Sequence, residues 1–489
     1  MRCPVFVYLT TALLLVTIGC SEDQPLVPEQ GSIEQSSAVK FDPERVAREI
    51  VAMSGWELGD EVEPFKGRDD GEEARPPVSV RQVDREQLTG KVAHYSYRVP
   101  VGDGPYDEIV IHRVVKENHP HRPIRTHKNI FLLHGDAVGF VKFLFGPASP
   151  STPDDHAAAI YLAKKGVDVW GMDQDWILVP SGTMDFSFMS DWGLQHQVDN
   201  LQFGMATARS ARMLTGAGFG KMNLLGYSSG GMTAYALANQ ETQIPMQERH
   251  VGGLIPADIP YIIDPANAAG RAFTCAAAAD LGDALAAGIY QAEDGVLFLT
   301  LSALARSDPD GASPVFDGLT NLQAALMFVT QTWQFFPAND WWHYMGGLFE
   351  DGIPVSLEYT PIEGCLDFLA TASPYEPNRF VYDYFRVFCN EESLPFTAHL
   401  AEITIPVLYL GAAGGLGEGG FYTTTLLGSS DITLVNPALR PPDEIASDIG
   451  HIDLWTATDA EKIFWKPLLK WIRTHTNAPG RSMPRGAGR

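Results

Sequence analysis

The sequence predicts an α/β fold: a mostly parallel sheet with helices on both faces and an inserted, mainly helical segment. Short apolar runs typical of buried strands alternate with helical patterns from residue 129 to 260 and again from 401 to 476. Such alternation favours parallel strands joined by crossover helices. Residues 261–400 interrupt the alternation with alanine-rich and aromatic segments. We expect the carboxyl ends of the parallel strands to face one common crevice.

A hairpin is expected at the amino-terminal edge of this sheet. Apolar and polar residues alternate over Ala93–Val99 and Glu108–Lys116, on either side of a Gly-Asp-Gly-Pro turn, and this pattern is typical of strands with one buried face. Residues 40–90 ahead of the hairpin are charged. One helix is expected at 41–53, and the rest of this segment is interpreted as a solvated lead-in.

The remaining core elements follow from hydrophobic periodicity. Buried strands are expected at Asn129–Leu133, Val167–Trp170, Met222–Leu225, Val251–Ile255, Ile405–Leu410 and Asp431–Val435, and helices at Asp154–Lys165, Asp191–Thr215, Arg271–Ala287 and Ala460–His475. The chain is accordingly divided into residues 1–20 (signal), 21–90 (polar tether and lead-in), 91–260 (core, first part), 261–400 (helical cap), 401–476 (core, second part) and 477–489 (tail).

The stretch Lys221–Ala238 joins a strand to a helix through Gly-Tyr-Ser-Ser-Gly. A serine on so sharp a turn adopts a strained backbone conformation, and side chains in place of the flanking glycines would collide with the strand or the helix. We therefore expect Ser228 to project above the sheet. The backbone N–H of Ser229 lies at a helix N-terminus, where partial positive charge can stabilise an oxyanion.

Charge and the first twenty residues bear on partners and compartment. The formal net charge of −25 argues against nucleic acid as a partner, because like charges repel within a Debye length. Arg2 precedes an apolar stretch, Val5–Ile18, that is too short for a stable membrane span and is typical of an export signal. The ending Thr-Ile-Gly-Cys resembles the bacterial lipobox, which implies that Cys20 is lipidated and that the protein is a cell-envelope lipoprotein. Simple secretion is the alternative, because Thr17 stands where leucine is usual.

Three cysteines remain after the signal: Cys275, Cys365 and Cys389. An exported protein can keep a disulfide, and Cys365 with Cys389 is the pair closest in sequence, leaving Cys275 buried or alone. The chain has no Cys-x-x-Cys and no histidine-rich metal spacing, so no metal site and no cofactor is predicted.

The order of these parts resembles the α/β-hydrolase superfamily, and within it the capped lipase-like and esterase-like members. Four motifs carry the resemblance: His134-Gly135-Asp136, Asp168-Val169-Trp170, Gly226-Tyr227-Ser228-Ser229-Gly230 and Gly450-His451-Ile452-Asp453. It covers residues 91–476. The resemblance implies a serine hydrolase acting on a small-molecule or lipid ester through an acyl-enzyme on Ser228.

The resemblance also implies roles for other residues. His451, after the last strand, takes the place of the general base, whose ordinary pKa suits proton transfer near neutral pH. His134 is the rival histidine, and its position implies a structural role in the oxyanion strand. The backbone N–H groups of Asp136 and Ser229 would then form the oxyanion hole.

A serine hydrolase of this kind also needs an acidic residue beside the histidine, and the candidates for this acid depart from the commoner pattern. Most relatives carry an Asp after the strand equivalent to 405–410, but here that loop is glycine-rich, with Glu418 as its carboxylate. Some members take the acid from the strand after the elbow helix, where Asp258 stands. Because the acid must fix the imidazole tautomer from a rigid position, Asp258 is preferred and Glu418 remains the alternative.

The aromatic segments Phe328–Phe336 and Trp341–Phe349 have two open interpretations: they line an apolar substrate pocket, or they form the cap's own core. Two functional alternatives also stay open. An acyltransferase or peptidase would use the same nucleophile, and a catalytically silent binding protein would account for the missing Asp after residue 410.

Overall fold

The computed structural model describes residues 42–59, 80–337, 342–391 and 394–476. A 10-stranded sheet forms the centre, in the order β1-β2-β3-β6-β5-β7-β8-β13-β14, with β4 paired to β3. Strands β1, β2, β3 and β6 pair antiparallel, and every pair from β6 through β5, β7, β8 and β13 to β14 is parallel. The predicted α/β class with a mostly parallel core is confirmed.

The strands of this sheet are β1 (Gln82–Thr89), β2 (Val92–Pro100), β3 (Glu108–His119), β4 (Arg122–Pro123), β5 (Asn129–Leu133), β6 (Asp168–Asp173), β7 (Met222–Tyr227), β8 (Val251–Ala257), β13 (Val407–Leu410) and β14 (Ile432–Val435). The predicted hairpin is the β2–β3 pair, but β1 and not this hairpin forms the edge of the sheet. The other predicted strands match within a few residues. β1 was not predicted, because its residues Gln82–Thr89 carry no clear alternation of apolar side chains.

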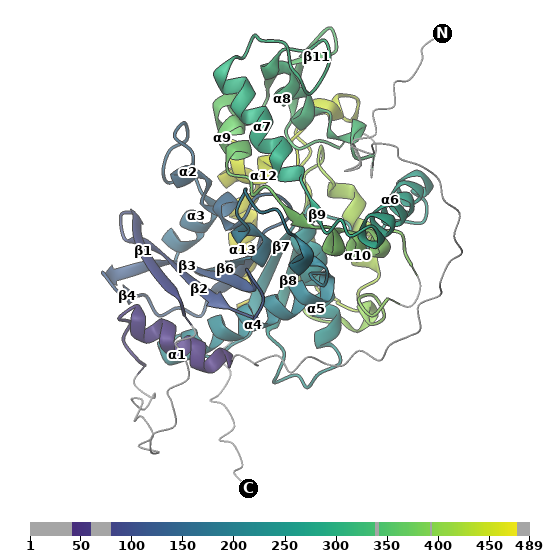
Figure 1. The fold of residues 1–489 in the computed structure, drawn as a ribbon. Coiled ribbons are helices and arrows are strands. Elements are labelled where there is room, and N and C mark those ends of the chain that lie inside the picture. The colour runs from purple at the N-terminus through teal and green to yellow at the C-terminus, as the bar shows by residue number, and fades with distance from the viewer. Residues whose placement is uncertain (1–41, 60–79, 338–341, 392–393, 477–489) are drawn as a thin grey trace.

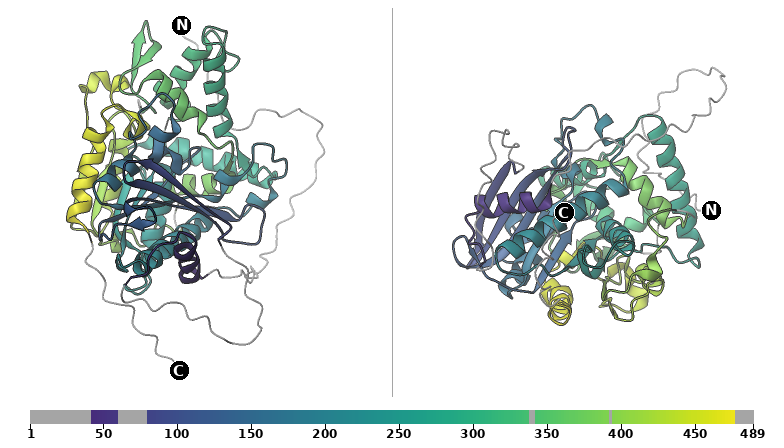
Figure 2. Two further views of the ribbon diagram at one scale, coloured as in Figure 1. Left: turned by 90° about the vertical axis from the view of Figure 1, so that its left-hand side faces the viewer. Right: turned by 90° about the horizontal axis from the view of Figure 1, so that it is seen from below.

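Helices cover both faces of the sheet. They are α1 (Pro43–Met53), α2 (Phe145–Ala148), α3 (Ala158–Lys164), α4 (Leu194–Leu214), α5 (Ser229–Glu241), α11 (Phe421–Thr425), α12 (Asp453–Thr456) and α13 (Lys466–Thr474). Figure 2 shows α1 and α13 on opposite sides of the sheet. Successive residues of β5 follow the same division: Phe131 and Leu133 join the core beneath α1 and α4, and Ile130 and Leu132 join the core beneath α3 and α13.

The lead-in is less solvated than the sequence indicated. The helix expected at 41–53 is present as α1, and its residues Val46, Ala47, Ile50 and Val51 are buried, so it packs on α4 instead of standing in water. Trp56 is also buried, with its ring 4.4 Å below the guanidinium of Arg113. Burial of this apolar stripe ties the chain ahead of β1 to the core.

Residues 261–400, called the insertion from here on, connect β8 to β13. They contain α6 (Ala268–Ala286), α7 (Asp294–Ser307), α8 (Asn321–Thr330), α9 (Ile362–Ala370) and α10 (Asn378–Phe388), with the short strands β9 (Gln291–Ala292), β10 (Gly347–Glu350), β11 (Ile353–Leu357) and β12 (Glu376–Pro377). Figure 1 shows α7, α8 and α9 grouped at one end of the molecule and α6 beside α10. No helix among the described residues is long and apolar enough to cross a membrane.

The disulfide joins Cys275 to Cys389, and Cys365 is a free, buried thiol. The expected Cys365–Cys389 pair is therefore wrong. Cys275 lies on α6 and Cys389 follows α10, and these two helices pack against each other, whereas Cys365 lies on α9 in a separate apolar core with α7 and α8. Sequence separation was a poor guide to the pairing, because helices that are distant in the sequence pack against each other in the insertion.

Candidate active site

Ser228 stands between β7 and α5 in a strained conformation. Its backbone angles are φ 55° and ψ −133°, a region that costs a residue with a side chain free energy and persists only when the surroundings impose it. The surroundings do so here, because the Ser228 N–H donates to the carbonyl of Ala257 (3.0 Å), which extends the pairing of β7 with β8 up to the turn.

The two flanking glycines are required by close contacts, as predicted. A Cβ on Gly226 would lie 2.7 Å from Cβ of Ala234 in α5, and a Cβ on Gly230 would lie 2.8 Å from the carbonyl oxygen of Leu133. Real Cβ atoms do not approach so closely, so only glycine lets the helix begin directly above the strand. This packing fixes the height of Ser228 above the sheet.

The strand end His134-Gly135-Asp136 lies against Ser228. A Cβ on Gly135 would lie 2.5 Å from Cβ of Ser228 and 3.1 Å from its Oγ, so the backbone between His134 and Asp136 passes beside the hydroxyl. The N–H of Asp136 and the N–H of Ser229, the first residue of α5, are the two donors expected at this place. Donors fixed in the backbone need no rearrangement when negative charge develops nearby.

His134 holds this strand end in position. It is fully buried, its Nδ1 lies 2.7 Å from the carbonyl oxygen of Gly135, and its Nε2 accepts a hydrogen bond from the N–H of Gln174 (2.9 Å). Burial lowers its pKa to about 4, which keeps the ring neutral. Because both ring nitrogens are engaged by the backbone, His134 has no nitrogen left to act as a base.

His451 lies against Tyr227, the residue before Ser228. Its ring stacks on Tyr227 with centroids 4.6 Å apart, and the Tyr227 hydroxyl donates to its backbone carbonyl (3.1 Å). The rings of Trp342 and Tyr344 approach it to 6.1 and 6.0 Å. The structure thus brings the predicted base and Ser228 to neighbouring positions, without a hydrogen bond between them among the described residues. Such bonds are often long until a substrate is bound.

The two candidate acids are placed very differently. Asp258 is fully buried, and its Oδ2 lies 2.6 Å from Nδ1 of His451. The backbone N–H groups of Ala412 (2.8 Å) and Leu416 (3.0 Å) also donate to this carboxylate. Glu418 is exposed. With Nδ1 held by Asp258, the neutral imidazole presents Nε2 as a proton acceptor.

The glycine-rich loop after β13 makes room for this pair. A Cβ on Gly415 would collide with Oδ2 of Asp258 and would lie 3.1 Å from the backbone nitrogen of His451, and one on Gly414 would collide with the ring of His343. The loop therefore contributes backbone donors to the acid where the commoner pattern would contribute the acid itself. That use of glycine could not be inferred from the sequence.

Two carboxylates near His451 in the sequence hold its loop and do not contact its ring. Asp453 accepts from the N–H groups of Gly450 (2.8 Å) and Gly346 (2.9 Å) and from the Thr360 hydroxyl. Asp448 accepts from the N–H of Leu439 (2.9 Å) and other backbone donors of its own segment. A contact with the insertion, through residue 346, thus helps to position the loop that carries His451.

The aromatic residues of the insertion take part in apolar packing, and two of them also lie beside His451. Phe328 packs with Phe298 and Phe335 in the core shared by α7, α8 and α9. Tyr344 packs against Phe328 and also adjoins the ring of His451, as does the buried Trp342. Helical spacing could not separate the groups, because Trp342 and Tyr344 lie outside any helix.

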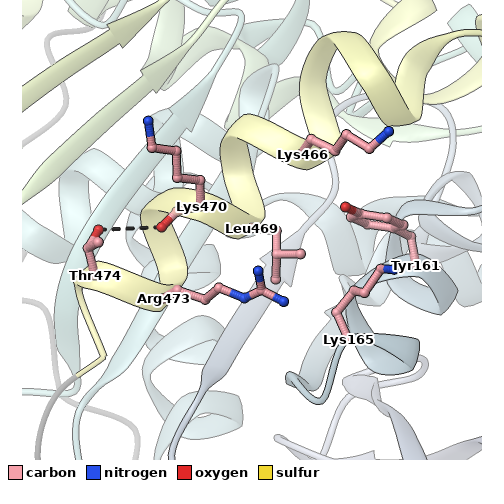
Figure 3. A pocket seen from close by; sticks show the side chains of 7 residues that line it. All are labelled: Tyr161, Lys165, Lys466, Leu469, Lys470, Arg473 and Thr474. Atoms are coloured by element: carbon pink, nitrogen blue, oxygen red, sulfur yellow. Dashed lines mark hydrogen bonds between the residues drawn. The ribbon is translucent and has the colours of Figure 1, made fainter.

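An open groove of about 530 Å³ between α3 and α13 has a different character. Figure 3 shows Tyr161 of α3 and Lys165, which follows α3, facing Lys466 and Arg473 of α13. It contains neither Ser228 nor His451. Lys466 is paired with Glu461 (3.2 Å), and we assign this solvated basic surface no chemistry. Among the described residues, no group of histidine, cysteine and acidic side chains is arranged to hold a metal ion.

Comparison with solved structures identifies the fold. A "putative lipase" from Sulfolobus solfataricus aligns with 80% of this chain and 99% of its own, with a TM-score of 0.52 and 17% identity. A soluble variant of monoglyceride lipase from Saccharomyces cerevisiae (85% and 100%, TM-score 0.43, 13% identity) and an esterase from Thermogutta terrifontis (78% and 99%, 0.38, 14%) also align. No family model and no curated relative matches the sequence.

The structure places the chain among proteins with the α/β-hydrolase fold. The strand order, the turn at Ser228 after β7 and the position of His451 after β14 agree with that placement. At 17% identity the likeness is one of fold, and the activity has to be argued from the site.

Proposed function

We propose that this protein is a serine hydrolase that cleaves carboxylic esters. The observation that carries the proposal is the hydrogen bond between Asp258 and Nδ1 of His451 (2.6 Å), formed beside the strained Ser228 turn. A buried carboxylate on one imidazole nitrogen fixes the tautomer that a serine nucleophile requires and stabilises the imidazolium that forms during attack.

The chemistry follows from the positions of these groups. Ser228 Oγ attacks the ester carbonyl carbon while His451 Nε2 takes its proton, and the N–H groups of Asp136 and Ser229 stabilise the oxyanion. His451 returns the proton to the leaving alcohol as the carbon–oxygen bond breaks, which leaves an acyl-enzyme. Water, activated by the same histidine, then attacks the acyl carbon and regenerates Ser228.

A fluorophosphonate probe and a series of p-nitrophenyl esters of graded chain length test this function. We expect the probe to label the wild-type protein and hydrolysis to be detectable, with both lost in Ser228→Ala. Ser181→Ala is the matched control, because it removes a hydroxyl from an exposed serine outside the site. A folded wild-type protein that neither reacts with the probe nor hydrolyses any ester would contradict the proposal.

We also propose that the protein is exported and held to the cell envelope by a lipid on Cys20. This residue lies outside the described part of the chain, and the support is the lipobox-like sequence alone. A covalent lipid would be the anchor, so Cys20→Ala should move the protein from the membrane to the soluble fraction after cell fractionation. Retention of this variant in the membrane would contradict a lipid anchor at Cys20.

A further inference from the structure

The chain makes a strained turn at Asp136, the residue whose backbone N–H is the proposed oxyanion donor. The Val138 N–H donates to the carbonyl of Asp136 (2.6 Å), and Ala137 at the centre of this three-residue turn has a φ of 57°. A turn of this kind with a positive φ at its centre is rare, and a residue with a side chain keeps such a conformation only when its surroundings impose it. The backbone around the oxyanion donor therefore needs support from other segments.

The insertion supplies part of this support through the segment that leads into β12. The Ser373 N–H donates to the carbonyl of Ala137 (2.6 Å). Ser373 packs tightly on α7, because a Cβ on Gly295 would collide with the Ser373 backbone. Three residues further on, Glu376 pairs with Ala292 in the β12–β9 ladder. Residues 373–376 thus form a fixed link between the insertion and the strained turn.

Glu376 makes the second contact of this link with the turn, through its side chain. Glu376 is 2% exposed, and its carboxyl group lies within hydrogen-bonding distance of the carboxyl group of Asp136. The buried Oε1 of Glu376 and the buried Oδ1 of Asp136 accept no hydrogen bond from a described N–H or hydroxyl donor. Two ionised carboxylates would repel each other here and would have no hydrogen to share. A proton on one of them turns the contact into a hydrogen bond.

Burial decides which of the two carboxyl groups carries the proton. Burial raises the pKa of Glu376 well above its usual value, Asp136 raises it next and Asp294 raises it further. Asp136 keeps some accessible surface, so its charged form remains partly hydrated. The ammonium group of Lys142, which lies over the ring of Tyr227 at 4.6 Å, acts on both carboxyl groups. A protonated Glu376 beside an ionised Asp136 leaves one negative charge near this cation.

We propose that Glu376 is a positioning residue of the active site: its protonated carboxyl group donates a hydrogen bond to the Asp136 carboxylate and so holds the Asp136 N–H in place for the oxyanion. This inference rests on the proposed ester hydrolysis. Glu376 acts through Asp136 and not on the substrate. Together with the hydrogen bond from Ser373 to Ala137, it holds the strained turn at two successive residues. A backbone donor that is fixed in advance needs no rearrangement when the oxyanion forms.

The test compares two replacements of Glu376 that are similar in size. Glu376→Gln keeps a donor, its amide N–H, and should keep most of the wild-type kcat for p-nitrophenyl ester hydrolysis. Glu376→Leu has no donor and should lower kcat by about 10- to 100-fold with little change in KM, because a displaced oxyanion donor is felt in the transition state. Glu293→Gln, an exposed glutamate ahead of α7, is the control.

Circular dichroism shows whether each variant is folded. Wild-type kcat in folded Glu376→Leu overturns the proposal. An equal loss of kcat in Glu376→Gln and Glu376→Leu also overturns it, because the site would then need the charge of the carboxylate and not a donor.

The partner of Glu376 is tested with Asp136→Ala, which removes the carboxyl group and keeps the backbone N–H. This variant should lower kcat to a similar extent, although the loss of a negative charge beside the oxyanion would by itself raise kcat. Because Asp136 keeps accessible surface, the variant should fold even if Glu376→Leu does not. Adding Glu376→Leu to Asp136→Ala should lower kcat no further. Wild-type kcat in Asp136→Ala, or losses that multiply in the double variant, overturn the proposal.

Infrared spectroscopy separates this inference from the proposed function. The wild-type protein at pH 6 should show a band of a protonated carboxyl group that is lost in Glu376→Gln and shifted in Asp136→Ala. If no ester is hydrolysed but this band is observed, ester hydrolysis fails and the carboxyl hydrogen bond stands. If esters are hydrolysed and the wild-type and Glu376→Gln spectra agree, Glu376 carries no proton, so the positioning role fails and the hydrolase stands.

Discussion

Two sets of carboxylates lie close to the Ser228 turn, and the protein holds them in opposite ways. Asp258 receives hydrogen bonds from two backbone N–H groups and from His451. The carboxyl groups of Glu376 and Asp136 lie within hydrogen-bonding distance of each other, and burial followed by Asp136 raises the pKa of Glu376 well above its usual value. The first carboxylate is surrounded by donors that favour its negative charge, whereas the second pair is buried in a way that favours a proton shared between its two carboxyl groups.

This difference shows where the fold stabilises a negative charge and where it disfavours one. Donors around Asp258 come from the backbone of the loop after β13, so they are present whether or not a ligand is bound. Glu376 is contributed by the insertion, and its burial there disfavours the ionised carboxylate.

The largest expected effect comes from replacing Asp258, the carboxylate that receives hydrogen bonds from His451 and two backbone N–H groups. Asp258→Asn should lower kcat by about 10³ to 10⁴ through loss of charge and selection of the wrong imidazole tautomer, with an unchanged circular dichroism spectrum. Glu418→Gln is the control and should keep most activity, because Glu418 is exposed. The reverse result would assign the acid to the glycine-rich loop. If both variants remained active, Asp448 and Asp453 would need the same test.

A smaller effect is expected from disturbing the donors around Asp258 without touching its charge. The added methyl group of Gly415→Ala would collide with Asp258 Oδ2 and should lower kcat by about 10- to 100-fold, as small displacements of reacting groups do. Gly182→Ala serves as control, since nothing lies within 4 Å of a Cβ there. Equal activity of the two variants would show that the loop yields without moving the acid.

The smallest effect concerns stability, and its sign follows from the pKa of Glu376. Because burial and Asp136 raise this pKa in the folded state, the unfolded chain ionises first as pH rises. Wild-type stability from this group is fully present below the ordinary glutamate pKa and is lost as pH rises. Glu376→Gln should therefore raise Tm at pH 8 by about 2 to 4 °C, and leave Tm unchanged at pH 4.

Calorimetry at the two pH values checks this prediction, with Glu293→Gln as the exposed control. Asp136, Asp294, Lys142, Tyr344 and Tyr384 are the titratable groups that act on Glu376. A lower Tm of Glu376→Gln at both pH values would mean that the carboxyl group has a stabilising partner, and the contrast with Asp258 would disappear.

Much of the sheet was predictable because its parallel strands are buried on both faces and read as continuous apolar runs, as in Asn129–Leu133. The glycines at positions 226 and 230 predicted the turn between β7 and α5, because a larger residue at either position would clash with neighbouring atoms. The strand β1 was not predicted because an edge strand with an exposed face has a weaker alternation of apolar and polar residues. Steric contacts between residues that are close in the sequence could therefore be predicted, whereas the presence of an edge strand could not.

The rest of the site depends on contacts between distant segments. Nothing in the sequence near Glu376 or Asp294 indicates that β12 and β9 would pair and bring them to Asp136. The role of Gly415 is equally hidden, since its neighbour Asp258 precedes the whole insertion. The disulfide shows the same limit: Cys389 pairs with Cys275, which sequence distance disfavoured.

That disulfide closes a covalent ring in the chain, because Cys275 and Cys389 are separated by 114 residues. The ring contains α7, α8 and α9, and with them Asp294 and Glu376. A protease that cuts the backbone once anywhere inside the ring leaves a single covalent molecule, which separates into two pieces only after reduction. One cut inside the ring would therefore not release the segment that carries Asp294 and Glu376.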